Sequence, residues 1–382
     1  MIIPPMVLYL MENCTILSAV LLTLMITTLL WFIIACINTP LWAAHICAKG
    51  SKSFFFASMF YPSKVRNRIF VFYAFARLSD DLIDEYTGEQ QISNFRFLKR
   101  VLDYWYTNDI SAKEVCSSIP KLPIAPNTFS VETIQKIIFS LESIVKECKI
   151  PRWAFELLML GFKHDTNLHW ISDEKDLLKY CICVASSIGV ICTHLYQTGG
   201  VTKEVLSNAA SLGIAFQLTN ISRDIITDLK ELQRIYVPKS WMNAEQRQQF
   251  QQMCSGNDVL IEANRNKSIR NYSVRLIKMA EVYYSDAWKG IKCLPKGVRM
   301  AVYSALLIYR EIGMKILREN VYPNRSFVPI TDKLKLIIGA KESPKFAEAE
   351  LSDFKNRASE MLQEVIEKLQ SESQVSKLVR KF

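Results

Sequence analysis

IFVFYAFARLSDDLID, residues 69–84, is apolar through its first turns and then places carboxylates at helical spacing. Arg77, Asp80, Asp81 and Asp84 stand at i, i+3, i+4 and i+7, which is one stripe of a helix. Like charges four residues apart repel by roughly 0.2–0.5 kcal/mol, and burying them costs far more unless a cation compensates. The stretch therefore predicts a core helix whose charged end holds a cation.

A second helix of the same design is predicted around residues 212–228. Gln217, Asn220, Asp224 and Asp228 stand at i, i+3, i+7 and i+11 after the apolar run LGIAF, and Arg223 is adjacent. Carboxylate and amide oxygens suit Mg²⁺ or Mn²⁺, and arginine suits phosphate oxygens. The alternative is a solvated charged helix face, which the apolar flanks and the duplication disfavour. The two stripes together predict a metal-binding cleft for a diphosphate.

Several motifs follow one another in an order and spacing found in a known family. They are SKSF (51–54), YAFAR (73–77) leading into DDLIDE (80–85), YCICVASSIG (180–189), QLTNISRD (217–224), RIYVP (234–238) and AEVYY (280–284). By these motifs the chain, from about residue 48 to about residue 340, resembles the squalene/phytoene synthase family of head-to-head prenyl transferases. It departs from the usual pattern at His164-Asp165, where Met-Asp is usual, and at Ala76, Ile182, Ser186 and Thr227.

The resemblance implies an all-α fold, an isoprenoid-synthase-type helical bundle around a central cavity. It implies a 15-cis-phytoene synthase that joins two geranylgeranyl diphosphates through a cyclopropyl diphosphate, with Mg²⁺ (or Mn²⁺) and without NADPH. The metal ligands would be Asp80, Asp84, Asn220, Asp224 and Asp228. The four aspartates are also expected to be catalytic, together with Tyr236. The expected substrate-binding residues are Ser51, Ser53, Phe54, Tyr73, Arg77, Gln217, Asn220 and Arg223.

Three other functions remain open at this stage. A squalene or dehydrosqualene synthase would use farnesyl diphosphate, and a squalene synthase would also need NADPH. A non-catalytic relative could serve as a membrane-bound assembly or scaffold protein, but both Asp motifs are intact. A head-to-tail prenyl synthase or terpene cyclase also uses Asp-rich helices, although the Arg223–Asp228 segment followed by Arg234-Ile235-Tyr236 argues against it. The length of the substrate chain stays undetermined.

Composition limits the possible partners. The chain has 382 residues, of which 50% are hydrophobic, so it can bury a substantial core. Its net charge is +10. No Gly-rich phosphate loop is present, and the basic residues form no aromatic-interleaved patch, so nucleic acid is not expected as a partner. The expected partners are geranylgeranyl diphosphate, membrane lipid and other enzymes of the carotenoid pathway. The cysteines show no CxxC pair and are expected to be free thiols.

The N-terminal segment differs from the rest of the chain. Between Glu12 and Lys49 there is no Asp, Glu, Lys or Arg, and Thr15 to Ile37 alone would form a helix of about 35 Å. Positive residues follow it, which predicts a single-pass membrane protein with its catalytic domain in the cytosol. A buried core helix is the alternative. The segment also resembles the end of the cyclase half in fungal proteins that fuse lycopene cyclase to phytoene synthase.

These patterns divide the chain into three parts. Residues 1–47 form the hydrophobic N-terminal segment with its membrane helix at about 15–37, and residues 48–340 form the catalytic domain. Residues 341–382 contain apolar positions at helical spacing from Leu351 to Leu369 and are expected to form an amphipathic helix and tail. That helix is expected to pack on the body, with a role at a membrane surface or partner as the alternative.

Overall fold

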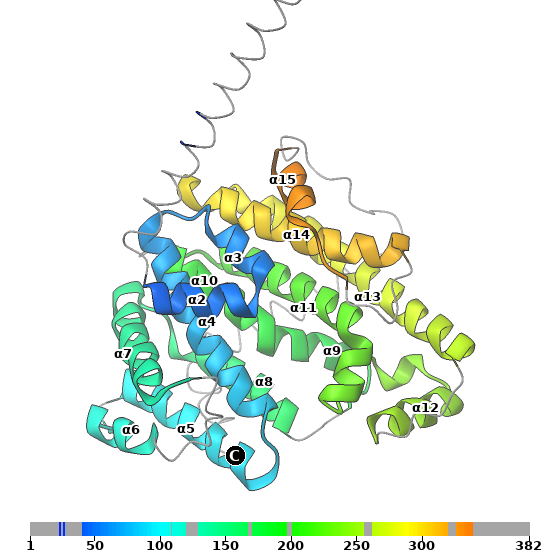
Figure 1. Cartoon of the computed structure of the whole chain (residues 1–382), viewed down its shortest axis with the longest axis horizontal. Coiled ribbons are helices and arrows are strands. Elements are labelled where there is room, and N and C mark those ends of the chain that lie inside the picture. Colours follow the sequence, from blue (N-terminus) through cyan, green and yellow to red (C-terminus); the bar gives the residue numbers. More distant parts are fainter. Residues whose placement is uncertain are drawn as a thin grey trace, which may run out of the picture.

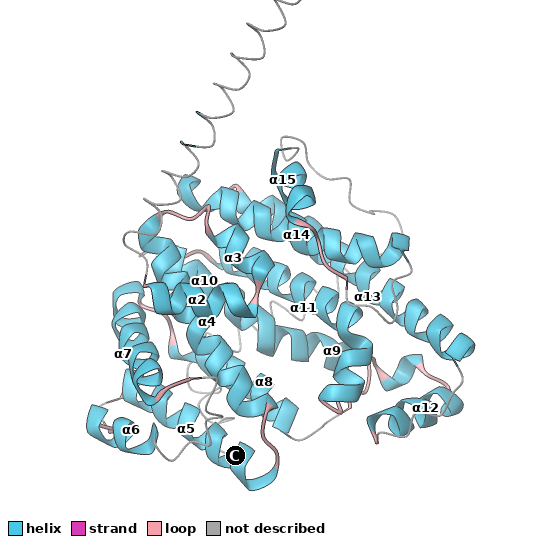
Figure 2. Ribbon diagram, viewed as in Figure 1, coloured by secondary structure: helices cyan, strands magenta, loops and turns pink. Residues whose placement is uncertain are grey.

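The computed structural model describes residues 23, 26, 40–107, 109–119, 129–166, 170–196, 201–255, 262–319 and 326–338. Within these ranges the regular elements are helices joined by short loops, and no strand is present (Figure 2). The predicted all-α class is confirmed.

The helices run in chain order as follows. The first part comprises α2 (Leu41–Gly50), α3 (Lys52–Ser58), α4 (Ser63–Asp84), α5 (Gly88–Tyr106), α6 (Ala112–Ser118), α7 (Val131–Cys148) and α8 (Arg152–Thr166). The second comprises α9 (Glu174–Cys181), the π-helix η2 (Ile182–Ser186), α10 (Ser187–Tyr196), α11 (Lys203–Glu231), the short 3₁₀-helix η3 (Lys239–Trp241) and α12 (Ala244–Cys254). The last comprises α13 (Glu262–Ile291), α14 (Lys296–Glu319) and α15 (Ile330–Ile338).

The core forms around the two helices that carry the Asp stripes. Helix α4 is buried nearly all round from Ile69 to Phe75, as its apolar sequence predicts. Helix α11 packs along much of its length against α13 and also contacts η2, α10 and α14. Helix α2 lies across α4, and α14 packs against α3 with α15 on its outer side (Figure 1). This arrangement holds α4 and α11 on opposite walls of one bundle.

Two glycines allow α11 to approach the η2–α10 segment closely. A Cβ on Gly213 would overlap the backbone carbonyl of Ala185, and a Cβ on Gly189 would lie 2.5 Å from the carbonyl oxygen of Ala209. The hydroxyl of Ser186 donates to the Ala210 carbonyl at 2.8 Å across the same interface. The π-helix therefore sits where two backbones meet without intervening side chains, a place where such bulges often shape a site.

The outer segments lie only partly within the described residues. The predicted membrane helix at 15–37 lies outside the described residues except for Thr23 and Ile26, and so does 341–382. The boundary expected between residues 47 and 48 falls inside α2, whose Ala43 and Cys47 are fully buried, so the helical body reaches back to Pro40. Within the described ranges, one helical run, Glu174–Tyr196, is long and apolar enough to cross a membrane, and 61% of its most apolar stretch is buried inside the protein.

Candidate active site

A cavity of about 400 Å³ lies between α3, α4, α8, η2–α10, α11, α13 and α14. One end is polar and is lined by Ser51, Arg77, Asp80, Asp165, Gln217 and Asn220. The rest is mostly apolar, with Phe54, Phe72, Phe162, Ile188, Leu212 and Phe216 among its walls. The cavity can therefore accept a molecule with a charged head and a long hydrocarbon body.

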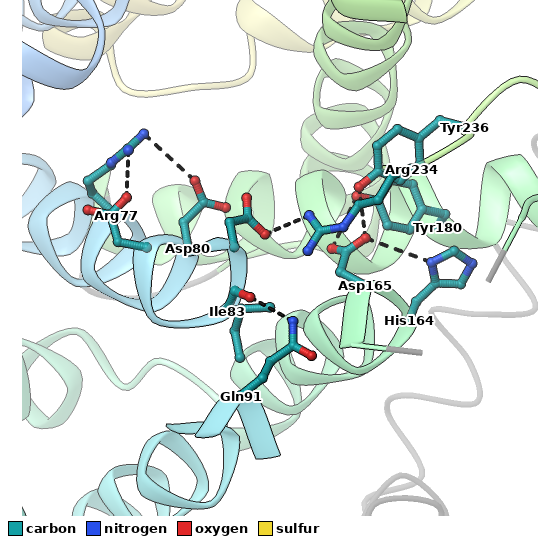
Figure 3. Close-up of polar contacts among 11 residues, drawn as sticks. Arg77, Asp80, Ile83, Gln91, His164, Asp165, Tyr180, Arg234 and Tyr236 are labelled. Atoms are coloured by element: carbon teal, nitrogen blue, oxygen red, sulfur yellow. Dashed lines mark hydrogen bonds and ion pairs between the residues drawn. The ribbon is translucent and has the colours of Figure 1, made fainter. Parts of the chain in front are cut away.

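The charged end of α4 is fixed by helix α5. The last carbonyls of a helix have no partner within the helix, and here two buried amides supply one. Gln91 Nε2 donates to the Ile83 carbonyl at 2.7 Å (Figure 3). Asn94 Nδ2 donates to the Leu82 carbonyl at 2.8 Å. These bonds hold the final turn of α4, and with it Asp80 and Asp84, in a defined orientation.

The arginine of each Asp stripe pairs with a neighbouring carboxylate. Arg77 Nη2 lies 2.5 Å from Asp81 Oδ1, and its Nη1 lies 3.8 Å from Asp80. Arg223 binds the adjacent Asp224 through two bonds, from Nε at 2.9 Å and from Nη2 at 2.5 Å. Both guanidinium groups are thus held beside the metal-ligand candidates, in positions from which they could turn to phosphate oxygens.

Arg234 connects the two sides of the site. Helix α11 ends at Glu231, and Gln233 adopts the left-handed backbone conformation, with φ 54°. The Arg234 amide then donates to the Asp228 carbonyl at 3.0 Å, and its Nη1 donates to Asp84 Oδ1 at 2.6 Å. The Arg234 side chain is only 7% exposed. This loop residue therefore ties the end of α11 to the end of α4.

Asp165 is the centre of a buried hydrogen-bonded group. Tyr236 donates its hydroxyl to Asp165 Oδ1 at 2.8 Å, and Tyr180 donates to Oδ2 at 3.3 Å. The two tyrosine rings stack with their centroids 4.8 Å apart, and Arg234 lies beside them (Figure 3). Burial is the main cause that raises the pKa of both tyrosines well above the ordinary value, so both hydroxyls stay protonated.

At the polar end of the cavity, carboxylates outnumber the arginines. Burial, together with the nearby Asp84 carboxylate, raises the pKa of Asp80 to about 7, although 49% of the side-chain surface stays accessible through the cavity. Burial also raises the pKa of Asp84, against the effect of Arg234. The pKa of Asp228 is raised well above its usual range by burial and then by Asp224. A divalent cation would relieve these interactions.

The donor set fits Mg²⁺ or Mn²⁺. Its oxygens come from carboxylates on α4 and α11 and from the Asn220 amide, which are hard ligands. Within the described residues, no three acidic, His or Cys side chains converge into a ready-made metal cage. Mg²⁺ commonly keeps waters and uses one or two carboxylates plus substrate phosphates, so an open set of this kind suits it.

The predicted site residues lie in three places relative to the cavity. Those that line the cavity are Ser51, Phe54, Tyr73, Arg77, Asp80, Gln217 and Asn220. Those that lie beside its polar end, outside the lining, are Asp84, Arg223, Asp224 and Asp228, and Tyr236 stands behind Asp165. Ser53 lies on α3 and does not line the cavity, whereas the neighbouring Ser51 caps that helix by accepting from the Phe54 amide at 3.3 Å.

Asp165, Tyr180 and Arg234 belong to the site although none of them was predicted from the sequence. All three lie in the quoted motifs or at the His164-Asp165 departure, yet none belongs to an i, i+4 pair of carboxylates. Their contacts join segments far apart in the chain, such as Arg234 with Asp84. Asp165 and Arg234 could have been noted as charged residues at the family motifs, whereas the uncharged Tyr180 gives no such signal in the sequence.

A model of the family described as squalene/phytoene synthase matches residues 47–329. The chain belongs to this family. Bifunctional lycopene cyclase/phytoene synthase from Phycomyces blakesleeanus is 29% identical over 310 residues, which are 76% of this chain and 48% of that protein. A 15-cis-phytoene synthase from Enterobacter agglomerans is 29% identical over 297 residues, 76% of this chain and 91% of that protein. The predicted family resemblance is confirmed, and the chain spans about half the length of the fungal fusion relatives.

The fold has solved counterparts. A dehydrosqualene synthase solved with a ligand aligns with a TM-score of 0.58 at 23% identity, covering 78% of this chain and 93% of that one. A squalene synthase from Alicyclobacillus acidocaldarius aligns with a TM-score of 0.54 at 18% identity, over 73% and 92%. At these identities the likeness shows the fold alone, and it confirms the helical bundle of the isoprenoid-synthase type.

Proposed function

We propose that the protein is a phytoene synthase that condenses two geranylgeranyl diphosphates head-to-head and releases both diphosphates. The observation that carries the proposal is the cavity, which has two carboxylates and the guanidinium of Arg77 at one end of a long apolar interior. Family membership supports a prenyl transferase, and the relatives named phytoene synthase support the C40 product. The reaction class also needs no nicotinamide cofactor, because the final step is loss of a proton.

Two ionisations make up the reaction. In the first, the C1–O bond of one substrate breaks, diphosphate leaves, and the double bond of the second substrate attacks the allylic cation. Loss of a proton then closes a cyclopropane ring and leaves a C40 cyclopropyl diphosphate. In the second, this intermediate loses its diphosphate, rearranges to join the two C1 atoms and loses another proton. Two diphosphates and two protons leave for each phytoene formed.

The metal would be held by Asp80 and Asp84 on α4, and by Asn220, Asp224 and Asp228 on α11. When bound, Mg²⁺ neutralises the diphosphate and thereby makes it a better leaving group. The raised pKa values of Asp80 and Asp228 support this assignment, because side chains that repel one another when ionised gain most from a shared cation.

The side chains of this protein would bind the diphosphates and shield the cations. Arg77 and Arg223 exchange their carboxylate partners for phosphate oxygens, and Ser51 offers a hydroxyl at the same end. The protonated Tyr180 and Tyr236 hold Asp165 in a fixed orientation. Their neutral hydroxyls are poor nucleophiles, so they do not capture the cation as phenolates would.

The apolar walls would protect the reactive intermediates. Phe54 and Tyr73 stack with their ring centroids 5.4 Å apart on the cavity wall, and Phe216 packs against Tyr309 at 4.4 Å. Aromatic faces stabilise nearby positive charge, and the enclosed surface excludes water that would quench it. Phe54, Tyr73 and Phe216 are therefore the aromatics that we place beside the allylic cations, with Tyr309 packed against Phe216.

We further propose that Thr15–Ile37 anchors the protein in a membrane with the catalytic part in the cytosol. The support is the sequence pattern, an uncharged stretch of spanning length followed by positive residues. The hydrocarbon substrate tails and product partition into lipid, so an anchored enzyme has direct access to both. Other enzymes of the carotenoid pathway are proposed as partners at the same membrane.

The test uses the full-length protein in detergent with C20 or C15 diphosphate and Mg²⁺, with and without NADPH. We expect a C40 hydrocarbon from the C20 substrate with Mg²⁺ alone, and none after EDTA treatment. Asp80→Asn and Asp224→Asn should each abolish product, whereas Asp332→Asn, which removes an exposed carboxylate on α15, should not. Product from the C15 substrate alone, or a strict NADPH requirement, would assign the protein to squalene-type synthesis. A folded protein without turnover on either substrate would indicate a scaffold.

A further inference from the structure

Two tyrosines stand at the apolar end of the cavity. The Tyr61 and Tyr196 hydroxyl oxygens lie 2.6 Å apart in a hydrogen bond, and their ring centroids are 5.3 Å apart. Both side chains line the cavity, and Tyr61 is only 5% exposed. Burial raises the pKa of both hydroxyls, so the pair stays neutral.

The distance from this pair to the charged end can be measured along two separate helices. Tyr180 bonds to Asp165 at the polar end, and Tyr196 follows sixteen residues later in the continuous run of α9, η2 and α10, a rise of about 24 Å. On α11 the cavity lining runs from Asn220 to Val205, a rise of about 22 Å. The pair is therefore separated from the carboxylates by the full length of the cavity.

The pair is also held firmly by the start of α4. Arg66 Nη1 donates to the Tyr61 carbonyl at 3.3 Å, and Arg68 Nη1 donates to the carbonyl of Leu195, next to Tyr196, at 3.3 Å. Both arginines are buried. Because each tyrosine bonds to the other and its backbone segment bonds to α4, the two rings form a fixed wall, unlike an aliphatic end that could repack around a longer chain.

We propose that the Tyr61–Tyr196 pair is the end stop of the hydrocarbon cavity and determines the longest prenyl chain that the protein accepts. The inference rests on the proposed function and specifies its substrate range. A prenyl tail whose diphosphate lies at the carboxylates extends along η2–α10 and α11 until its last isoprene unit meets the two rings. A chain one isoprene unit longer would have to displace them.

The test compares kcat/KM for C15, C20 and C25 diphosphates in wild type and in Tyr196→Ala. Removing the ring should open space for one more isoprene unit and raise the C25-to-C20 ratio at least about tenfold, because one or more methylenes in an apolar pocket discriminate by that much. Tyr196→Phe removes only the hydroxyl, so its ratio should stay near that of wild type. Tyr104→Ala removes a tyrosine that bonds to Glu142 and does not line the cavity, and it controls for general destabilisation.

A second variant acts in the opposite direction. Val205→Phe adds volume at the same end and should shift preference from C20 towards C15. An unchanged chain-length ratio in a folded Tyr196→Ala would overturn the inference, as would the same ratio change in Tyr104→Ala. If Tyr196→Ala does not fold, Val205→Phe decides alone, and no shift towards C15 overturns it. A wild type that uses only C15 contradicts the proposed function separately. The inference is then tested by the C20-to-C15 ratio in place of the C25-to-C20 ratio.

Discussion

Replacing Arg234 by methionine should destabilise the metal-free protein and show how the charges of the site are balanced. Arg234 donates to Asp84 at 2.6 Å, and the two side chains are 7% and 25% exposed. At about 4 Å between charges and an effective dielectric constant of about 20, their attraction is about 4 kcal/mol. The Asp84 carboxylate left behind can take up a proton, so we expect a net loss of about 3 kcal/mol at pH 8.

The pH dependence follows from the direction of the pKa shift. The pKa of Asp84 is already raised in the folded protein, and without Arg234 it rises further. The folded state then binds a proton more readily than the unfolded state, so the deficit of the variant is largest at high pH. It should shrink as the pH falls through the raised folded-state pKa towards the ordinary value for aspartate.

The assay is thermal or denaturant unfolding in EDTA at pH 8 and at pH 5.5, with Arg234→Met and wild type side by side. A loss of about 3 kcal/mol corresponds to a decrease of roughly 4–5 °C in Tm for a chain of this size. Lys289→Met serves as the control, because its partner Asp286 lies 3.4 Å away in an exposed pair. A Tm within about 1 °C of wild type at pH 8, or a deficit that grows at lower pH, would refute the reasoning.

Four other outcomes are expected. Asp80→Asn should raise Tm in EDTA at pH 8, because the pKa of Asp80 is raised to about 7 in the folded protein and its ionised form opposes folding. The gain should shrink as the pH falls below about 7 and vanish only near the ordinary pKa of aspartate, about 4; a constant gain would contradict this. Tyr236→Phe should cost about 1 kcal/mol in denaturant unfolding but reduce turnover more than that loss of stability explains; unchanged turnover would give Tyr236 a structural role only. Gly213→Ala should lower the unfolding free energy by about 3 kcal/mol, and a neutral result would show that α11 and η2 can separate. Full-length protein should stay with membranes after carbonate extraction. A form that begins at Pro40 should be more soluble and still convert detergent-dispersed substrate. Recovery of full-length protein in the soluble fraction would contradict the membrane anchor.

Local periodicity explains what could be predicted from the sequence. The two Asp stripes each lie within a single helix, where residues four apart share a face whatever the tertiary structure. The apolar turns before Asp80 and before Asp224 likewise predicted core helices, and α4 and α11 are packed into the core as expected. The family resemblance added the order of the helices and the central cavity.

Contacts between distant segments explain what could not be predicted. The pairing of Arg234 with Asp84 depends on a left-handed turn at Gln233, a residue with no strong preference for that conformation. The group around Asp165 joins α8, α9 and the loop after α11, and no periodicity within one segment indicates such a meeting. Ser51 and Ser53 look equivalent in sequence, and only the path of α3 places the first on the cavity and the second off it.

The direction of α4 and α11 bears on the order in which ligands could bind. Both helices finish at the charged end of the cavity, since Asp84 is the last residue of α4 and Asp228 stands in the final turn of α11. A helix attracts anions at its amino end, and its carboxyl end carries partial negative charge. The backbone here therefore repels a diphosphate, just as the aspartates do. Under the proposed mechanism, affinity for the substrate is conditional on the metal, so Mg²⁺ and diphosphate should bind as a pair, and neither should bind tightly alone.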